Sequence, residues 1–358
     1  MRIHFPHLLL AGLSLATTLA ATNAAPPAII FDTDYRSDCD DVSALAMLHA
    51  LEDMGKVTLL GAIATTTGRH VVGAIDAVNT RYGRPDLPIG VITREKGLNT
   101  TLNSDDFAGT LANPKSFVSD QTNATAPNAT ALYRRLLHQA SDRGVTILVV
   151  GGQTAIHRLL TSGADHDGDG IARTGHELVA AKVSELVIMG GHFTNPRFTE
   201  FNIRLDLKAA RHVAGHWPGR ITYTGFEIGE KILTGAALTD PETNPVARAY
   251  KRHRGTTGGA GVIGDRKSWD QTAVLIAAVG DDWNGRKLWE ISPSHAIDFD
   301  DIGRAIVTPS ATVNRHFITQ SDNLMTHAEI ASIISDLMTA TPRTPGPRPG
   351  TAAPANLR

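Results

Sequence analysis

The chain has 358 residues, a formal net charge of −2 and a single cysteine, Cys39. A charge balance so close to neutral gives no support for binding to nucleic acid, which attracts strongly basic proteins. One cysteine excludes an intrachain disulfide.

The N-terminal segment, residues 1–25, has the pattern of a secretory signal peptide. Arg2 gives a positive start, Leu8–Ala20 an apolar stretch, and Thr22–Ala25 small residues suited to cleavage. The apolar stretch is short and rich in Ala and Thr for a membrane span, although an uncleaved anchor is the alternative. No later segment reaches membrane length. We therefore expect a secreted protein, extracellular or periplasmic, that does not bind the membrane after signal cleavage.

Residues 27–340 alternate between short apolar runs and helical patterns. Strands are expected at Ala28–Phe31, Val57–Ala64, Thr146–Val150, Glu185–Met189 and Arg220–Tyr223. Helices are expected at Val42–Leu51, Val72–Tyr82, Ala129–Ser141, Ala155–Leu160, Gly175–Lys182 and Leu207–His212. The alternation predicts an α/β fold, a single domain with a mainly parallel central sheet flanked by helices.

The C-terminal part of the chain is less regular. A helix from about Thr272 is followed by a loop-rich stretch near Ile291–Arg315 and a final amphipathic helix at about Met325–Met338. Residues 341–358 are rich in Pro, Gly, Thr and Ala and cannot build a core, so we expect a disordered tail.

The most informative feature is a run of acids directly after the first strand: Asp32, Asp34, Asp38, Asp40 and Asp41. In open α/β folds, ligands bind outside the carboxyl ends of the strands, which is where this turn would lie. Crowded carboxylates raise one another's pKa values, and a hard cation with oxygen ligands, such as Ca²⁺, relieves the repulsion. The alternative is a solvated acidic turn favoured by the dipole of the following helix.

Three later blocks place polar residues at the ends of expected strands and helices. They are Gly151-Gly152-Gln153-Thr154, Met189-Gly190-Gly191 with Glu200-Phe201-Asn202, and Ser268-Trp269-Asp270. Together with the acidic turn, in this order over Ile29 to about Met338, they resemble the nucleoside hydrolase family of the inosine-uridine-preferring type. The acidic turn is similar to the family's opening D-x-D-x-G-x-D-D, with two extra residues before the final acid pair.

The resemblance implies an N-ribohydrolase that binds one Ca²⁺ and cleaves ribonucleosides into ribose and free base. By this likeness Asp34 would be a metal ligand and the general base that activates a metal-bound water. The remaining metal ligands would be Asp41, the backbone carbonyl of Thr154, and Asp270. The acidic residues also suit this reaction on general chemical grounds, because carboxylates near the sugar stabilise the positive charge that develops as an N-glycosidic bond breaks.

The same likeness gives the substrate residues. Asp40, Glu200 and Asn202 would bind the ribose. Asp32 would lie behind the metal ligands, and Asp38 offers a competing register for them. The Asp40–Asp41 register is preferred, because the helical pattern begins straight after this pair.

The chain departs from the family pattern where the base would leave. The family's Pro-Gly after the second acid is Tyr35-Arg36, and the His that often precedes the late acid is Trp269. Trp269 could stack on a purine or simply pack against its neighbours. His192 and His253 are candidates for the missing leaving-group acid.

Two other functions remain open on the sequence alone. One is a hydrolase of another riboside or a small glycoside, and the other is a non-catalytic, calcium-stabilised secreted binding protein. The expected partner is a small-molecule nucleoside or riboside, and the resemblance is compatible with a homo-oligomer. Glycosylation sequons occur at Asn99, Asn123 and Asn128, and their use depends on the host.

Overall fold

The computed structural model describes residues 1, 25–35, 38–93, 107–113 and 115–343. Most of the expected signal peptide, the sequon at Asn99 and most of the expected tail lie outside these residues. The predictions made for those segments stay predictions.

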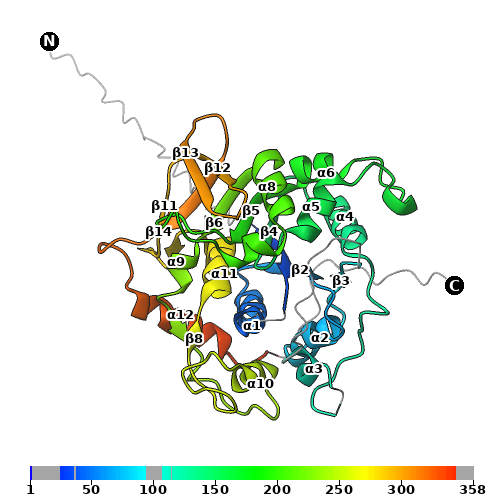
Figure 1. The fold of residues 1–358 in the computed structure, drawn as a ribbon, viewed down its shortest axis with the longest axis vertical. Helices are drawn as coiled ribbons and strands as arrows, with labels where there is room; N and C mark the ends of the chain where they lie inside the picture. The colour runs from blue at the N-terminus through cyan, green and yellow to red at the C-terminus, as the bar shows by residue number, and fades with distance from the viewer. Residues whose placement is uncertain (2–24, 36–37, 94–106, 114, 344–358) are drawn as a thin grey trace.

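A mainly parallel sheet crosses the molecule, as the alternating pattern predicts (Figure 1). Its parallel part runs in the order β14-β6-β5-β4-β1-β2-β3. These strands are β1 (Ala28–Thr33), β2 (Thr58–Ala64), β3 (Ile89–Val91), β4 (Val145–Val149), β5 (Val183–Met189), β6 (Arg220–Thr224) and β14 (Arg315–Thr319). The first strand of the chain therefore lies inside the sheet, between β2 and β4.

The C-terminal edge of the sheet is antiparallel, and here the prediction of a loop-rich stretch over Ile291–Arg315 is wrong. β12 (His295–Phe299) and β13 (Ala305–Pro309) form a hairpin beside β14, and β11 (Glu290–Ile291) also pairs with β14. Only Ile297 and Phe299 of β12 are buried, so the hairpin lacks the continuous apolar run that revealed the inner strands. Two small ribbons complete the strands: β7 (Leu233–Thr234) with β8 (Arg266–Lys267), and β9 (Asp282–Trp283) with β10 (Arg286–Lys287).

Helices cover both faces of the sheet (Figure 1). They are α1 (Asp40–Asp53), α2 (Val71–Arg81), α3 (Ala108–Leu111), α4 (Ala129–Gln139), α5 (Thr154–Thr161), α6 (Gly175–Lys182), α7 (Phe201–Leu205), α8 (Leu207–His216), α9 (Phe226–Gly229), α10 (Pro245–Arg252), α11 (Trp269–Val279) and α12 (His327–Met338). Among these, none is both long and apolar enough to span a membrane; the search covered the described residues.

The alternation of side chains along β1 separates two cores. Ile29 and Phe31 pack into the core that includes the apolar residues of α1, α2, α11 and α12. Ile30 points the other way, into the core built with α4, α5, α6 and α8. Since β1 is buried on both faces, its end is held rigidly by both layers of helices.

The helix after the acidic turn begins earlier than the apolar pattern predicts. α1 starts at Asp40 rather than Val42, so the acid pair Asp40–Asp41 forms its first turn. Acids are favoured in a first turn, where the helix dipole and free N–H groups are positive. The acid pair is thereby placed on a rigid element and not on the loop before it.

The ends of β1 and β4 approach so closely that one residue between them has to be glycine. A Cβ added to Gly151 would lie 2.7 Å from the backbone nitrogen of Asp34 and 2.8 Å from its Cβ. These contacts are shorter than real side chains allow. Gly151 therefore fixes the position of Asp34 relative to β4.

We predict that Gly151→Ala lowers the free energy of unfolding by about 1–3 kcal/mol, the usual cost of overpacking a tight interior. The measurement is urea unfolding followed by circular dichroism. Gly163→Ala is the matched control, because a Cβ there meets nothing within 4 Å. Equal stability of the two variants would contradict the close approach.

Candidate active site

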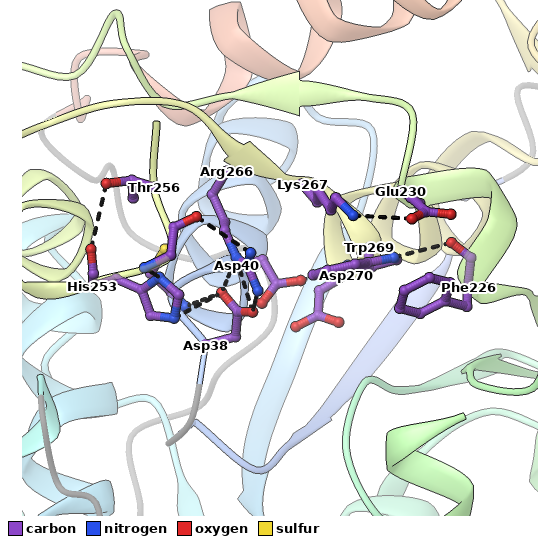
Figure 2. Close-up of polar contacts among 12 residues, drawn as sticks. Asp38, Asp40, Phe226, Glu230, His253, Thr256, Arg266, Lys267, Trp269 and Asp270 are labelled. Carbon is purple, nitrogen blue, oxygen red and sulfur yellow. Dashed lines mark hydrogen bonds and ion pairs between the residues drawn. The ribbon is translucent and has the colours of Figure 1, made fainter. Parts of the chain in front are cut away.

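Three buried carboxylates meet at the carboxyl end of the sheet. Asp40 and Asp41 lie in the first turn of α1, and Asp270 lies in the first turn of α11. One oxygen of each lies within 4.8 Å of the others. The three residues are only 3%, 2% and 3% exposed. Figure 2 shows Asp40 and Asp270 side by side.

Burial and mutual repulsion raise the pKa values of all three groups. Burial is the largest cause for each of them. For Asp41 the next causes are Asp34 and Asp40, and for Asp270 they are Asp40 and Asp41. Without a cation the cluster can ionise fully only at high cost, because charges in a poorly hydrated site repel strongly.

The donor set fits a hard divalent cation. Asp40, Asp41 and Asp270 offer only oxygen ligands, which Ca²⁺ and Mg²⁺ prefer over the nitrogen and sulfur ligands of zinc sites. Asp38, Cys39 and His253 also bring ligand atoms within 4.8 Å of one another. That second group is already neutralised, because the carboxylate of Asp38 binds a guanidinium.

Two further acids, Asp32 and Asp34, lie at the end of β1. Asp34 is the first residue after the strand and is 8% exposed. Asp32 is fully buried, and its Oδ2 accepts a 2.6 Å hydrogen bond from the hydroxyl of Tyr133. In the described part of the chain, Oδ1 of Asp32 has no hydrogen-bond partner. Burial raises the pKa of Asp32 well above its ordinary value.

The turn between β1 and α1 is held by bonds to Asp41. The hydroxyl of Thr33 donates to Oδ1 of Asp41, and the backbone N–H of Tyr35 donates to the same oxygen at 3.1 Å. Tyr35 has a φ of +44°, a conformation that glycine adopts more easily. Its side chain is fully buried and packs edge-on against Phe107. Packing of the ring against Phe107 thus holds Tyr35 in a backbone conformation that glycine would adopt more easily.

Thr154 begins α5, beside the end of β4. Its hydroxyl donates to Oδ2 of Asp206 at 2.7 Å, and Asp206 also caps the N-terminus of α8. The side chain of Thr154 is therefore engaged, and the role expected for its backbone carbonyl stays a prediction.

Glu200 and Asn202 lie at the ends of the neighbouring strands β4 and β5. Glu200 caps α7 and accepts backbone N–H bonds from Asn202, Ile203 and Gly191. The amide of Asn202 donates to the carbonyls of Val150 at 2.9 Å and Met189 at 3.3 Å. Both residues are buried at the same edge of the sheet as Asp34. These hydrogen bonds hold the local backbone, and the ribose contacts expected from the resemblance stay predictions.

Asp38 is separated from the three-carboxylate cluster by its partners. Arg266 donates from Nε to both carboxylate oxygens, at 2.9 and 3.0 Å, and a further bond comes from Nη2. Nε2 of His253 lies 3.5 Å from Asp38 (Figure 2). A carboxylate in a bidentate bond with Arg is poorly placed to bind a metal as well. The contacts therefore favour the Asp40–Asp41 register.

Trp269 packs against several neighbours and is half-buried. Its indole N–H donates to the carbonyl of Phe226 at 3.0 Å, and the two rings lie 5.0 Å apart (Figure 2). The guanidinium of Arg266 lies 4.9 Å and the ammonium of Lys267 5.6 Å from the indole ring. These contacts explain its position without a ligand, and stacking on a base stays a prediction.

Two residues of this site were missed in the sequence. Arg266 is two residues from the Ser268-Trp269-Asp270 block, and an isolated Arg gives no sign of its distant partner Asp38. Tyr133 lies on a helix more than 100 positions from Asp32. Only the fold brings these pairs together.

The fold and the cluster define an α/β protein with a buried carboxylate site where the central strands end. A sequence profile described as inosine-uridine preferring nucleoside hydrolase matches residues 29–277, well over half of the chain. The chain therefore belongs to the nucleoside hydrolase family. No curated protein sequence gave a match.

Solved structures share the fold at low identity. A plant nucleoside hydrolase aligns with a TM-score of 0.62 and 16% identity, covering 88% of this chain and 99% of its own. The purine-preferring ribonucleoside hydrolase from Gardnerella vaginalis aligns with a TM-score of 0.61 and 17% identity, covering 87% and 99%. The type III effector protein XopQ, complexed with adenosine diphosphate ribose, gives 0.63 and 15%, covering 89% and 94%.

We predict that Ca²⁺ stabilises the protein, and more so at pH 8 than at pH 5. The folded-state pKa values of Asp40, Asp41 and Asp270 lie above the reference value of 3.8, so above about pH 4 the folded chain holds more protons than the unfolded chain. Without metal, the free energy of unfolding therefore falls as pH rises, because these three groups must lose their protons inside the folded chain. At low pH they stay protonated and this loss is absent. Calcium binds the ionised carboxylates, so the stabilisation that calcium adds increases as pH rises.

Thermal unfolding with Ca²⁺ and with a chelator measures this effect. At a hundredfold excess over Kd, one bound ion adds about 2.7 kcal/mol. Asp270→Asn should lose the calcium response, while the exposed Asp336→Asn should keep it. A response that is absent at both pH values would contradict the cation site.

Proposed function

We propose that the chain is a secreted, Ca²⁺-dependent N-ribohydrolase that cleaves ribonucleosides to ribose and free base. The observation that carries the proposal is the buried cluster of Asp40, Asp41 and Asp270, next to Asp34 at the end of β1, in a member of the nucleoside hydrolase family. A site that concentrates carboxylates suits a reaction in which positive charge develops on a sugar.

The metal ligands in this proposal are Asp34, Asp41, Asp270 and the carbonyl of Thr154. When bound, calcium would lower the pKa of a coordinated water and hold it in place. Asp41 is oriented for such a role by the hydroxyl of Thr33 and the N–H of Tyr35. Asp32, fixed by Tyr133, supports the end of β1 from behind.

Asp34 acts as the general base. It takes one proton from the attacking water as the water oxygen forms a bond to C1′ of the ribose. The bond from C1′ to the base nitrogen breaks, and its electron pair goes to the base, which then takes up a proton. Asp40 binds ribose hydroxyls, and Glu200 and Asn202 complete the sugar site at the ends of β4 and β5.

Turnover of a panel of purine and pyrimidine ribonucleosides tests the proposal. We predict that Asp34→Asn lowers kcat by at least about 10²-fold, since a general base contributes roughly 10²–10⁴-fold. Release of ribose is measured with Ca²⁺ and with a chelator, and Asp336→Asn serves as the matched control. Wild-type turnover by a folded Asp34→Asn variant would overturn the role of Asp34.

A charged riboside is the second candidate substrate. Arg266 and Lys267 lie against the ring of Trp269, next to Asp270 in the chain, and are paired with Asp38 and Glu230; a charged substrate would compete with these carboxylates for the two cations. XopQ, a structural neighbour, is complexed with adenosine diphosphate ribose. The substrate panel therefore includes this compound, and release from it alone would favour the second candidate. Calcium binding without release from any compound would favour a binding protein.

Secretion is proposed from the N-terminal sequence. The pattern of Arg2, Leu8–Ala20 and Thr22–Ala25 predicts cleavage near residue 25. Expression of the full chain followed by N-terminal sequencing of exported protein checks this prediction. Retention of an intact N-terminus in the cell fraction would count against it.

A further inference from the structure

His192 lies just after the end of β5, near Glu200 and the start of α9. It directly follows Gly190–Gly191 at the end of β5, and the N–H of Gly191 donates to Oε2 of Glu200 at 3.2 Å. The carbonyl of Gly191 accepts the N–H of Phe226 at 2.9 Å. The backbone next to His192 therefore touches both the residue expected to bind ribose and the start of α9.

A row of aromatic rings connects His192 to the carboxylate cluster. Its ring lies 4.8 Å from that of Phe198 and 6.1 Å from that of Phe226. Phe226 in turn lies 5.0 Å from Trp269, which precedes Asp270 in α11. These rings form a contiguous aromatic cluster that ends next to Asp270 in the chain, and aromatic faces of this kind can stack on a purine or pyrimidine ring.

Glu227 is fixed beside the imidazole of His192. Its Oε2 lies 3.2 Å from Nδ1, and each residue is 9% exposed. The other oxygen, Oε1, accepts the N–H of Phe193 at 2.9 Å. A Cβ on Gly225 would lie 2.5 Å from Oε2 of Glu227, so the glycine makes room for this carboxylate. The pair is thus held by the backbone of both adjoining strands.

The contacts of His192 suit a group that gains and gives a proton. In the neutral ring, Nδ1 accepts the N–H of Asn195 at 3.1 Å. Oε2 of Glu227 is buried and, within the described residues, accepts no hydrogen bond. A proton on Nδ1 would give this oxygen a donor at 3.2 Å. In the described chain, Nε2 of His192 has no protein partner.

The other candidates for this role are engaged. His253 faces Asp38 with Nε2 at 3.5 Å and accepts the N–H of Gly255 on Nδ1 at 3.1 Å. The indole N–H of Trp269 donates to the carbonyl of Phe226. Neither has the arrangement of His192, in which one nitrogen faces a carboxylate and the other has no bond to protein.

We propose that His192 is the general acid that protonates the leaving base, with Glu227 as its positioning residue. The inference rests on the proposed N-ribohydrolase function. As the bond from C1′ to the base nitrogen breaks, its electron pair goes to the base, and the proton on Nε2 of the charged His192 passes to a base nitrogen. The ring is left neutral as the tautomer with its proton on Nδ1, facing Glu227, and this tautomer lacks the bond that Nδ1 accepts from Asn195 in the tautomer protonated on Nε2.

Leaving-group dependence tests the proposal. The substrates are inosine, whose base needs a proton to leave, and p-nitrophenyl β-D-ribofuranoside, whose phenolate does not. If the aryl riboside is not accepted, 7-methylguanosine replaces it, because its cationic base leaves as a neutral molecule. His192→Gln should lower kcat on the nucleoside by roughly 10²–10⁴-fold and leave the second substrate close to wild type.

Glu227→Gln should show the same split with a smaller loss, and it keeps the test valid if His192→Gln does not fold. His138→Gln, an exposed change on α4, is the matched control. Equal losses on both substrates, or no loss on either, would overturn the role of His192. Wild-type protein that cleaves none of these ribosides would overturn the proposed function itself, and the inference with it.

Discussion

The repulsion among buried carboxylates is the constraint on which this site depends. Asp40, Asp41 and Asp270 are placed by the first turns of two helices that pack against each other, so the charges cannot move apart. Burial raises their pKa values well above the ordinary range and so disfavours their charged forms. A cation turns the same arrangement into a stable one. The cluster is thus suited to a bound cation.

Asp38 and Asp41 lie in one short segment but have different partners. Asp38 is neutralised by Arg266, which comes from the β7–β8 ribbon. Among the described residues, the donors to Asp41 are the uncharged hydroxyl of Thr33 and the N–H of Tyr35. Three residues apart in the chain, one carboxylate is paired with a guanidinium and the other is not. This division favours the Asp40–Asp41 register for a bound cation, and the register stays a prediction.

Much of the fold was predictable because its signals are local. The β-branched runs of β1, β4 and β5 and the apolar repeats of α1 and α4 can be recognised within single windows of sequence. The β12–β13 hairpin escaped because its residues face solvent on one side, and the start of α1 was placed two residues late because acids carry no apolar pattern.

Only those residues of the candidate site that belong to a sequence motif could be predicted. The acidic turn, Asp270 and the Glu200–Asn202 block stand out by their residue types and order. The partnerships Arg266–Asp38, Tyr133–Asp32 and Glu227–His192 join distant positions, and no feature of either partner's sequence marks the other. Such pairs arise from the strand order, which sequence patterns do not specify.

The position of β1 inside the sheet has a consequence for the order of folding. β1 is made first, yet it pairs with β4, which emerges more than 100 residues later. Asp270 comes later still, on a helix that packs on α1. Contacts between such distant segments form slowly, because long loops must close first. Asp40, Asp41 and Asp270 can come together only after α11 has been synthesised, so a cation bound by all three would report that the chain has folded at least that far.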